Sequence, residues 1–163
     1  MNKALFLDRD GILNIDKTYV YKYEDIQWVD GIFELIAFAN SNGFLVIVLT
    51  NQSGVAQGMY KEEDVKALHL KMSSFLDAKK LHIDDWFYCT EYISERRKPR
   101  PGMMVEAQQK YDIDLSKSFM VGDKISDVLE ISGPKTYLLS GKYSFDDLDR
   151  NKAKVFNSLT EIL

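Results

Sequence analysis

Acidic side chains follow two of the apolar runs in this sequence. Asp8 and Asp10 come directly after residues 4 to 7, and Asp123 and Asp127 follow a later run. If these runs are neighbouring strands, the carboxylates converge, and their repulsion raises their pKa values unless a cation neutralises the charge. Magnesium suits such a site because it accepts one or two carboxylates, keeps several waters and takes a further ligand from a substrate phosphate. The pattern therefore indicates a magnesium site.

Two more segments have the chemistry of a phosphate site. Thr50 and Asn51 end the apolar run from Phe44 to Leu49, and Lys98 lies in a basic segment. Carboxylates together with a lysine indicate phosphoryl transfer, in which fixed charges stabilise the transferring group. Each residue alone has a simpler explanation, because an aspartate after a strand is usually a turn or cap residue and a basic segment is usually a solvated loop. The hypothesis therefore depends on the combination.

Strands that alternate with helices must position these residues. We expect buried strands at residues 4–7, 44–49, 86–89, 119–121 and 136–139, and helices over residues 32–39, about 61–80, 102–111 and from about Ser126. Tyr19, Tyr21 and Tyr23 alternate as the face of a strand or hairpin would. This order predicts an α/β fold with a doubly wound, Rossmann-like parallel sheet. Ligands bind such sheets at the carboxyl ends of the strands, where the polar residues lie.

The composition is that of an ordinary globular protein. The 163 residues, 45% of them hydrophobic, suit a single domain covering residues 1–163. The first apolar run is too short for a signal peptide or a membrane span, so we expect a cytoplasmic protein that does not bind membranes. A net charge of -4 repels nucleic acid phosphates, so nucleic acid is not the expected partner. Cys89 is the single cysteine, which leaves few ligands for zinc.

Four segments resemble, in order, the motifs of the haloacid dehalogenase (HAD) superfamily. They are Asp8-Arg9-Asp10-Gly11, Leu49-Thr50-Asn51-Gln52-Ser53-Gly54, Arg97-Lys98-Pro99-Arg100-Pro101-Gly102 and Val121-Gly122-Asp123-Lys124. The likeness runs from about residue 3 to residue 142 and is greatest to the histidinol-phosphate and heptose-bisphosphate phosphatase branch. It implies a HAD-like phosphatase without a large cap domain, with Mg2+ as cofactor and a small phosphorylated metabolite as substrate.

The resemblance also implies roles for individual residues. Asp8 is implied to attack phosphorus, and Asp10 to protonate the leaving alkoxide and then deprotonate the water that hydrolyses the aspartyl-phosphate. Thr50 and Lys98 are implied to hold the transferring phosphoryl group. The implied metal ligands are Asp8, Asp123 and the backbone carbonyl of Asp10, with Asp127 placed behind them. The implied substrate contacts are Asp16, Tyr19, Asn51, Gln52, Ser53, Arg97 and Lys124.

The chain departs from this branch in one loop. Members of the branch carry a zinc loop before the third motif, with a Cys-x-His pair and a later Cys-x-Cys pair. Here Cys89 is followed by Glu91 in the histidine position, and the second pair is missing. Four-coordinate zinc cannot form from these residues, so we expect no zinc. The segment from Thr90 to Arg96 is also shorter than that loop, so we expect a comparatively open substrate site.

Several phosphorylated molecules are candidate substrates. A D-glycero-D-manno-heptose 1,7-bisphosphate is the leading candidate, and histidinol phosphate is the second. A nucleic acid 3′-phosphatase is a further alternative, although the chain lacks a broad basic surface. From another class, a phosphoaspartate receiver also uses Asp, Thr and Lys, but it lacks the second carboxyl that Asp10 supplies. We expect the protein to act as a monomer.

Overall fold

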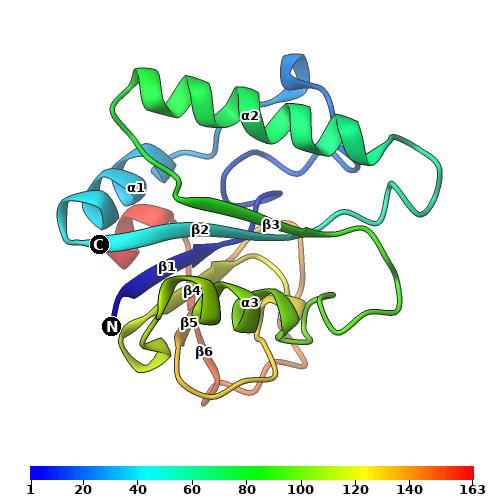
Figure 1. The fold of residues 1–163 in the computed structure, drawn as a ribbon. Helices are drawn as coiled ribbons and strands as arrows, with labels where there is room; N and C mark the ends of the chain where they lie inside the picture. The colour runs from blue at the N-terminus through cyan, green and yellow to red at the C-terminus, as the bar shows by residue number, and fades with distance from the viewer.

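The computed structural model describes residues 1–163 and contains one six-stranded sheet flanked by helices (Figure 1). The strands are β1 (Lys3–Leu7), β2 (Phe44–Asn51), β3 (Asp85–Cys89), β4 (Phe119–Gly122), β5 (Lys135–Leu139) and β6 (Ala153–Phe156). The helices are α1 (Ile32–Ser41), α2 (Glu62–Ala78) and α3 (Gly102–Tyr111), with short 3-10 turns η1 (Tyr23–Asp25), η2 (Leu115–Lys117), η3 (Ile125–Asp127) and η4 (Leu159–Ile162). All strand pairs are parallel, which confirms the expected Rossmann-like sheet.

The strand order places β1 and β4 side by side at the centre of the sheet. The order is β3-β2-β1-β4-β5-β6, so the chain builds outward from β1 in one direction and from β4 in the other. A reversal of this kind leaves a crevice at the carboxyl ends of the two central strands. Asp8 follows β1 directly and Asp123 follows β4 directly. The topology itself therefore brings these two carboxylates together.

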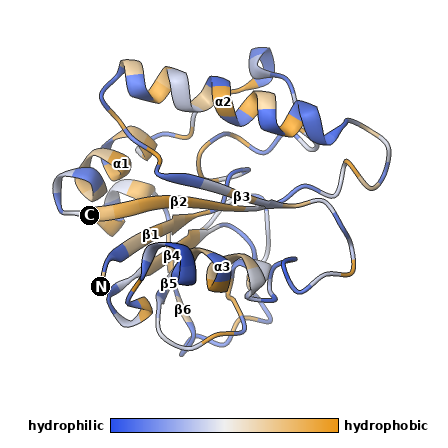
Figure 2. Cartoon of the chain, in the orientation of Figure 1, coloured by the Kyte–Doolittle hydropathy of each residue, from blue (hydrophilic) through white to orange (hydrophobic).

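Helices cover both faces of the sheet, α1 and α2 on one face and α3 on the other (Figure 1). Leu5 and Leu7 of β1 belong to the core beneath α1 and α2, whereas Ala4 and Phe6 belong to the core beneath α3. Burial on both faces explains why β1 is a continuous apolar run. In Figure 2 the central strands β1 and β2 are mainly hydrophobic, whereas α2 carries both hydrophobic and hydrophilic residues. None of the helices has the length and apolar character needed to cross a membrane.

The segment between β4 and β5 differs from expectation. The helix expected from about Ser126 is wrong, because after the single turn η3 the chain runs to β5 without an α-helix. The carboxylate of Asp127 accepts hydrogen bonds from the backbone N–H groups of Asp123 and Lys124, which closes a tight turn at this point. Pro134, which has no backbone N–H to donate, directly precedes β5. The segment therefore serves to bend the chain beside the carboxyl end of β4.

Two other segments also differ from expectation. Residues 19–23 form no strand or hairpin, because Thr18 and Tyr19 have φ angles of 60° and 56°, outside the extended region. The sequence patterns did not indicate β6, which pairs in parallel with β5 from Thr136 and Ala153 to Leu139 and Phe156. The tail of the chain thus adds the last strand of the sheet.

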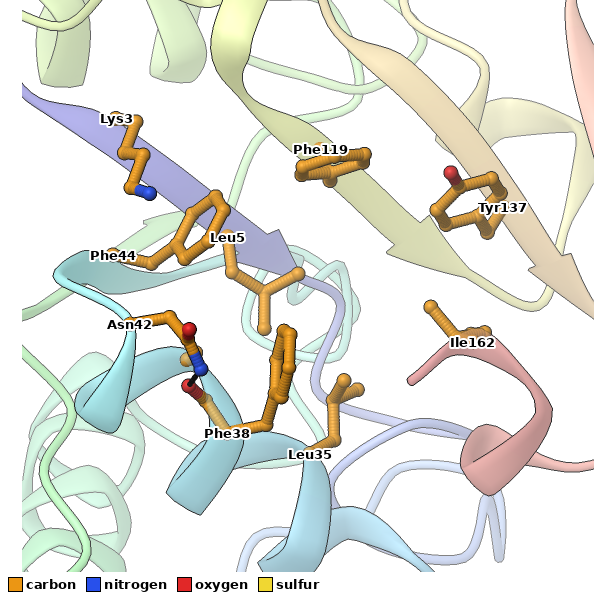
Figure 3. A pocket seen from close by; sticks show the side chains of 10 residues that line it. Lys3, Leu5, Leu35, Phe38, Asn42, Phe44, Phe119, Tyr137 and Ile162 are labelled. Carbon is orange, nitrogen blue, oxygen red and sulfur yellow. Dashed lines mark hydrogen bonds between the residues drawn. The ribbon is translucent and has the colours of Figure 1, made fainter.

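An apolar pocket lies at the amino ends of the strands (Figure 3). It has a volume of about 240 Å³, and its lining includes Leu35, Phe38, Phe44, Phe119 and Tyr137. Its charged lining residue, Lys3, has its ammonium 4.2 Å from the centroid of the Phe44 ring. No carboxylate lines this pocket, so it cannot hold a divalent cation in the manner expected from the sequence. The carboxylates Asp8 and Asp123 lie instead at the opposite, carboxyl ends of the strands.

Candidate active site

A buried ion-pair cluster lies at the carboxyl ends of β1 and β4. Lys98, on the connection between β3 and α3, is 4% exposed, and its Nζ donates to Asp8 Oδ1 at 2.9 Å and to Asp127 Oδ1 at 2.5 Å. Burial acts to lower the pKa of Lys98, but the negative charges of Asp127 and Asp8 outweigh it and raise the pKa overall. The side chain therefore stays an ammonium and supplies a fixed positive charge.

Three carboxylates meet beside this ammonium. Oxygen atoms of Asp8, Asp123 and Asp127 lie within 4.8 Å of one another, and all three residues are buried. Burial, reinforced by the negative charge of Asp127, raises the pKa of Asp8 to about 6. Burial and then the charges of Asp8 and Asp127 raise the pKa of Asp123 to about 8. Both shifts mean that the ionised carboxylates are destabilised here, and a divalent cation would offset their charge.

Asp123 has an oxygen without a partner. Its Oδ1 is buried and makes no hydrogen bond, which is unfavourable for a carboxylate. Gly11 makes room for this side chain, because a Cβ at position 11 would lie 2.1 Å from Asp123 Oδ2, and the φ of +94° also favours glycine. A divalent cation that prefers oxygen ligands fits this position, because it would supply the missing partner of Asp123 next to Asp8.

The carboxylate of Asp127 is already fully engaged within the protein. Oδ1 accepts from Lys98, and Oδ2 accepts from the backbone N–H groups of Asp123 at 3.0 Å and Lys124 at 3.1 Å. Gly122 allows this approach, since a Cβ at position 122 would lie 2.2 Å from Asp127 Cγ. These bonds orient Lys98 and the turn that carries Asp123. They support a place for Asp127 behind the metal ligands, which stays a prediction.

The carboxylate of Asp10 lies outside the cluster and faces hydrogen-bond donors. Nη2 of Arg9 lies 3.1 Å from each of its oxygens. Asn14 Nδ2 donates to Oδ1 at 3.0 Å, and Gln52 Nε2 donates to Oδ2 at 3.0 Å. The carboxylate is thereby held beside the carboxylate cluster, at the edge of a polar pocket.

Arg9 also contacts His69, a residue to which no sequence pattern assigned a role. Arg9 is fully buried, and its Nη1 lies 3.3 Å from Nε2 of His69 on α2. Burial, followed by the charge of Arg9, lowers the pKa of His69 well below its ordinary value, so the neutral ring can accept from the guanidinium. The ring stacks on Trp86 with centroids 4.3 Å apart. His69 therefore supports the arginine that orients Asp10.

The end of β2 faces the cluster from the other side. Thr50 Oγ1 accepts from Gln52 Nε2 at 2.9 Å. Asn51 uses its side-chain amide on the backbone of Lys98, donating to the carbonyl oxygen at 3.1 Å and accepting from the N–H at 3.0 Å. This double contact clamps the loop that carries Lys98 to the end of β2. The threonine hydroxyl and the lysine ammonium are thus fixed relative to each other.

A polar pocket of about 260 Å³ opens beside Asp10. All residues expected from the sequence to contact substrate line it, namely Asp16, Tyr19, Asn51, Gln52, Ser53, Arg97 and Lys124. The lining also includes Thr18, Tyr60, Ser126 and Tyr143, which the sequence analysis did not single out. The structure therefore brings the expected residues to one place, and their contact with substrate stays a prediction.

Tyr143 closes one wall of this pocket. Its hydroxyl donates to Asp16 Oδ2 at 2.8 Å, and Nζ of Lys142 lies 3.6 Å from the same oxygen. The ammonium of Lys124 lies 4.9 Å from the centroid of the Tyr143 ring. This tyrosine lies just beyond residue 142, where the motif likeness visible in the sequence was expected to end, and no local pattern indicated it. Tyr143 is recognised as a pocket residue by its hydrogen bond to Asp16, which only the folded chain forms.

Arg97 lines the pocket and has a donor without a partner. Its Nη1 is buried without a partner, and its guanidinium carbon lies 5.3 Å from the centroid of the Tyr92 ring. The neighbouring Arg96 ties the same loop to its surroundings, with Nε 2.6 Å from Glu106 Oε2 and Nη1 2.7 Å from the carbonyl oxygen of Tyr88. An unpaired guanidinium N–H at a pocket wall suits an anionic ligand.

Cys89 is a core residue. It is 2% exposed and packs in the core beneath α3. Its Sγ lies 3.5 Å from the carbonyl oxygen of Glu91. The expected absence of zinc stays a prediction.

Comparisons with known proteins identify close relatives. The model of the polynucleotide kinase 3 phosphatase family matches residues 4–157. The limit of residue 142 expected from the motifs was therefore too short, because the family model reaches residue 157. A D-glycero-alpha-D-manno-heptose-1,7-bisphosphate 7-phosphatase from Campylobacter jejuni is 44% identical over 127 residues, covering 77% of this chain and 74% of the relative. A D-glycero-beta-D-manno-heptose-1,7-bisphosphate 7-phosphatase from Photorhabdus laumondii is 34% identical over 173 residues, covering 98% of this chain and 92% of the relative.

A solved phosphatase structure shares the fold of this chain. The D,D-heptose 1,7-bisphosphate phosphatase from B. bronchiseptica, complexed with magnesium and phosphate, has a TM-score of 0.87 and 28% sequence identity, covering 98% of this chain and 95% of that chain. These relatives are phosphatases, and this protein is likewise a phosphoric monoester hydrolase. By its sequence, its fold and its cluster of carboxylates, the chain belongs to the polynucleotide kinase 3 phosphatase family, within the HAD-type phosphatases.

Proposed function

We propose that this protein removes the 7-phosphate from a D-glycero-D-manno-heptose 1,7-bisphosphate, by magnesium-dependent hydrolysis through an aspartyl-phosphate at Asp8. The observation that carries the proposal is the buried contact of 2.9 Å between Asp8 and Lys98, next to the unpaired Oδ1 of Asp123. A nucleophilic carboxylate, a fixed cation and an unsatisfied metal ligand lie together beside one polar pocket. Residues 1–163 would act as one catalytic domain and as a monomer.

Asp8 acts as the nucleophile. Lys98 and the backbone N–H of Arg9, each 2.9 Å from Oδ1, orient its carboxylate. The carboxylate attacks phosphorus, the bond from phosphorus to the sugar oxygen breaks, and Asp10 gives that oxygen a proton. Asp10 then takes a proton from the water that attacks the aspartyl-phosphate. The bond from phosphorus to Asp8 breaks, inorganic phosphate leaves, and both carboxyl groups return to their starting state.

The metal ligands are proposed to be Asp8, Asp123 and the backbone carbonyl of Asp10. All of these ligand atoms are oxygens, which magnesium prefers, and Asp123 Oδ1 has no hydrogen-bond partner of its own. When bound, the ion offsets the carboxylate charges and polarises the transferring phosphoryl group. The relative from B. bronchiseptica is complexed with magnesium and phosphate, which supports this choice of metal.

Thr50 and Lys98 are proposed to hold the phosphoryl oxygens. Thr50 Oγ1 accepts from Gln52, so the proton of its hydroxyl is free for a phosphoryl oxygen. Lys98 already touches the nucleophile and needs no movement to stabilise charge that develops beside it. A positioned donor of this kind commonly contributes about 3 kcal/mol to transition-state stabilisation.

The rim of the pocket suits a second phosphate. Arg97 lines the pocket and has an N–H without a partner, and its planar fork can bind a phosphate through two hydrogen bonds. Lys124 provides a second cation, and Asp16 with Tyr143 provides polar groups for sugar hydroxyls. The relatives from Campylobacter jejuni and Photorhabdus laumondii are named for heptose 1,7-bisphosphates. A phosphoryl position beside Asp8 and Lys98, and cations of Arg97 and Lys124 in the adjoining pocket, would suit the same substrate class for this chain.

One observation favours a second candidate. The matching family is described as a polynucleotide kinase 3 phosphatase, so a nucleic acid 3′-phosphate is the alternative substrate. Against it, the chain carries a net charge of -4, which repels a polymer of phosphates. The cations that line the pocket are Arg97 and Lys124, enough for one further phosphate but not for a long backbone.

A substrate panel tests the proposal. Phosphate release by the purified protein with Mg2+ would be compared for the heptose 1,7-bisphosphate, histidinol phosphate and a 3′-phosphorylated oligonucleotide, with Asp8→Asn as the inactive control. We expect the highest kcat/KM for the bisphosphate. A higher kcat/KM for histidinol phosphate or for the oligonucleotide would make that compound the substrate, and the assignment as a phosphatase would stand. Equal activity in Asp8→Asn would refute the proposed mechanism.

A further inference from the structure

Gln52 joins two residues that act in different parts of the proposed reaction. Its Nε2 donates both to Asp10 Oδ2 at 3.0 Å and to Thr50 Oγ1 at 2.9 Å. Asp10 follows β1 and is the proposed acid and base, whereas Thr50 lies on β2 and is a proposed phosphoryl holder. A side-chain amide has two N–H donors, so both donors of Gln52 are used within the protein. Gln52 is 1% exposed.

Tyr60 controls the other end of this amide. Its hydroxyl donates to Gln52 Oε1 at 2.6 Å, the shortest hydrogen bond of the group. If the amide turned over, Oε1 would face the Asp10 carboxylate and repel it, and Tyr60 would lose its acceptor. The Tyr60 hydroxyl therefore selects the one orientation in which Gln52 holds Asp10 and Thr50 together.

The ring of Tyr60 has a fixed place. It is 6% exposed and stacks on Tyr21, with centroids 5.2 Å apart and planes 12° apart. Gly54 provides the space for the ring, because a Cβ at position 54 would lie 2.2 Å from Tyr60 Cε1. Burial raises the pKa of Tyr60, which keeps the hydroxyl a donor at neutral pH.

We infer that Tyr60 is a positioning residue for the phosphatase reaction, acting through the amide of Gln52 on both the acid/base Asp10 and the phosphoryl holder Thr50. The inference rests on the proposed function. The Thr50 hydroxyl oxygen accepts a hydrogen bond from Gln52. Its distance of 3.5 Å to the Asn51 carbonyl oxygen is too long for a strong hydrogen bond. The threonine proton is thereby directed to the substrate.

Leaving-group dependence tests the effect on Asp10. An alkyl phosphate needs a proton on its departing oxygen, whereas p-nitrophenyl phosphate has a leaving group that departs without one. We expect Tyr60→Phe to lower kcat/KM about tenfold for the alkyl phosphate and by a clearly smaller factor for p-nitrophenyl phosphate. The matched control is Tyr21→Phe, which removes a hydroxyl from the stacked neighbour and leaves the Gln52 hydrogen bonds intact. It should change both values by less than about twofold.

A double-mutant cycle tests whether Tyr60 acts through Gln52. Gln52→Met keeps the length of the side chain and removes its hydrogen bonds. We expect Tyr60→Phe to have little further effect in the Gln52→Met background, because the residue that transmits its influence is gone. Additive losses, together with a raised KM in Tyr60→Phe, would show that Tyr60 contacts the substrate directly and would overturn the inference. So would an unchanged kcat/KM in Tyr60→Phe.

Two further measurements keep these outcomes distinct. If Tyr60→Phe does not fold, as judged by thermal melting, Gly54→Ala displaces the same ring and should reproduce the loss, while a wild-type rate would contradict the inference. The wild-type protein and Asp8→Asn are assayed in parallel. An inactive wild type, or an active Asp8→Asn, would refute the proposed function and the inference together. With those controls as expected, the Tyr60 results bear on the inference alone.

Discussion

Lys98 and Asp8 lie 90 positions apart in the chain, yet the ammonium of one donates to the carboxylate of the other at 2.9 Å. The contact exists because the loop before α3 crosses the carboxyl ends of β1 and β4, where the two halves of the sheet diverge. It sets the nucleophile beside the charge that stabilises its attack. Loss of Lys98 leaves the buried Asp8 without its cation, whereas loss of Asp8 leaves Lys98 paired with Asp127. Both changes should lower turnover, and loss of Lys98 should cost more stability.

Asp8→Asn and Asp10→Asn should each abolish turnover, for different reasons. The first replaces the nucleophile by an amide, and the second removes the group that gives and takes the proton. Phosphate release in the presence of Mg2+ measures both effects, and thermal melting checks that the variants are folded. As a control, Asp77→Asn changes an exposed aspartate on α2 and should leave turnover unaffected. Activity of Asp8→Asn within about tenfold of the parent would contradict the mechanism.

Lys98→Ala should lower turnover by about a hundredfold or more, because it removes a positioned charge at the transition state. The same change leaves Asp8 and Asp127 without their shared cation, so the free energy of unfolding should fall by about 3–5 kcal/mol. Lys66→Ala is the matched control, since its ammonium is exposed and 4.0 Å from Glu62. A wild-type rate in Lys98→Ala would mean that this lysine does not hold the phosphoryl group.

The metal-free protein should lose stability as the pH rises. The pKa values of Asp8 and Asp123 are about 6 and about 8, above the ordinary 3.8, so the folded state holds more protons than the unfolded state between about pH 4 and pH 8. The free energy of unfolding therefore decreases across this window, and the Tm measured with a chelator should fall. Added Mg2+ should raise the Tm most at the upper end, where both carboxylates are ionised.

Asp123→Asn provides the control for this pH dependence. The amide cannot titrate, so the fall in Tm between about pH 6 and pH 8 should flatten and the stabilisation by Mg2+ should weaken. A chelated wild-type protein whose Tm rises with pH across this window would contradict the prediction.

Arg97→Ala should distinguish the two phosphates of the proposed substrate. Arg97 lines the pocket and its Nη1 has no partner, so its loss should lower kcat/KM for the bisphosphate by about tenfold to a hundredfold and barely affect a monophosphate. Arg100→Ala is the control, because Arg100 lies in the same loop, pairs with the exposed Glu95 and does not line the pocket. Equal losses on both substrates in Arg97→Ala would remove the assignment of this arginine to the second phosphate.

Metal analysis should find no structural zinc. Cys89 is buried in the core, and Glu91 stands in the place of the histidine that the zinc loop requires. The purified protein, prepared without chelators, would be measured for zinc content alongside Cys89→Ser. Stoichiometric zinc that disappears in Cys89→Ser would show that the shortened loop still binds the metal.

The sequence by itself was sufficient to predict the central strands and the order of the catalytic motifs. β1 and β2 are covered on both faces, so each had to be a continuous apolar run that is visible without any partner. The polar residues that directly follow those runs then had to lie at the carboxyl edge of a parallel sheet. Asp8 follows the run of β1, Thr50 follows the apolar run of β2, and Asp123 follows β4 in the same way. Strand direction alone therefore places all three at this edge.

Only the tertiary structure decided the last strand and the segment before β5. Ala153–Phe156 is short and mixed in burial, so it has no apolar pattern of its own and becomes β6 through its pairing with β5. Residues after Ser126 could have continued as a helix by local preference. The carboxylate of Asp127 instead bonds to Lys98 and to the turn after β4, contacts that no local pattern reports.

The walls of the pocket were also decided by the folded chain alone. Tyr143 meets Asp16 across 127 positions, and Tyr60 reaches Gln52 from the loop that precedes α2. Periodicity reports how one segment shares its own residues between core and solvent. A hydrogen bond between side chains depends on where two segments lie relative to each other, which the packing of helices and loops around the whole sheet determines.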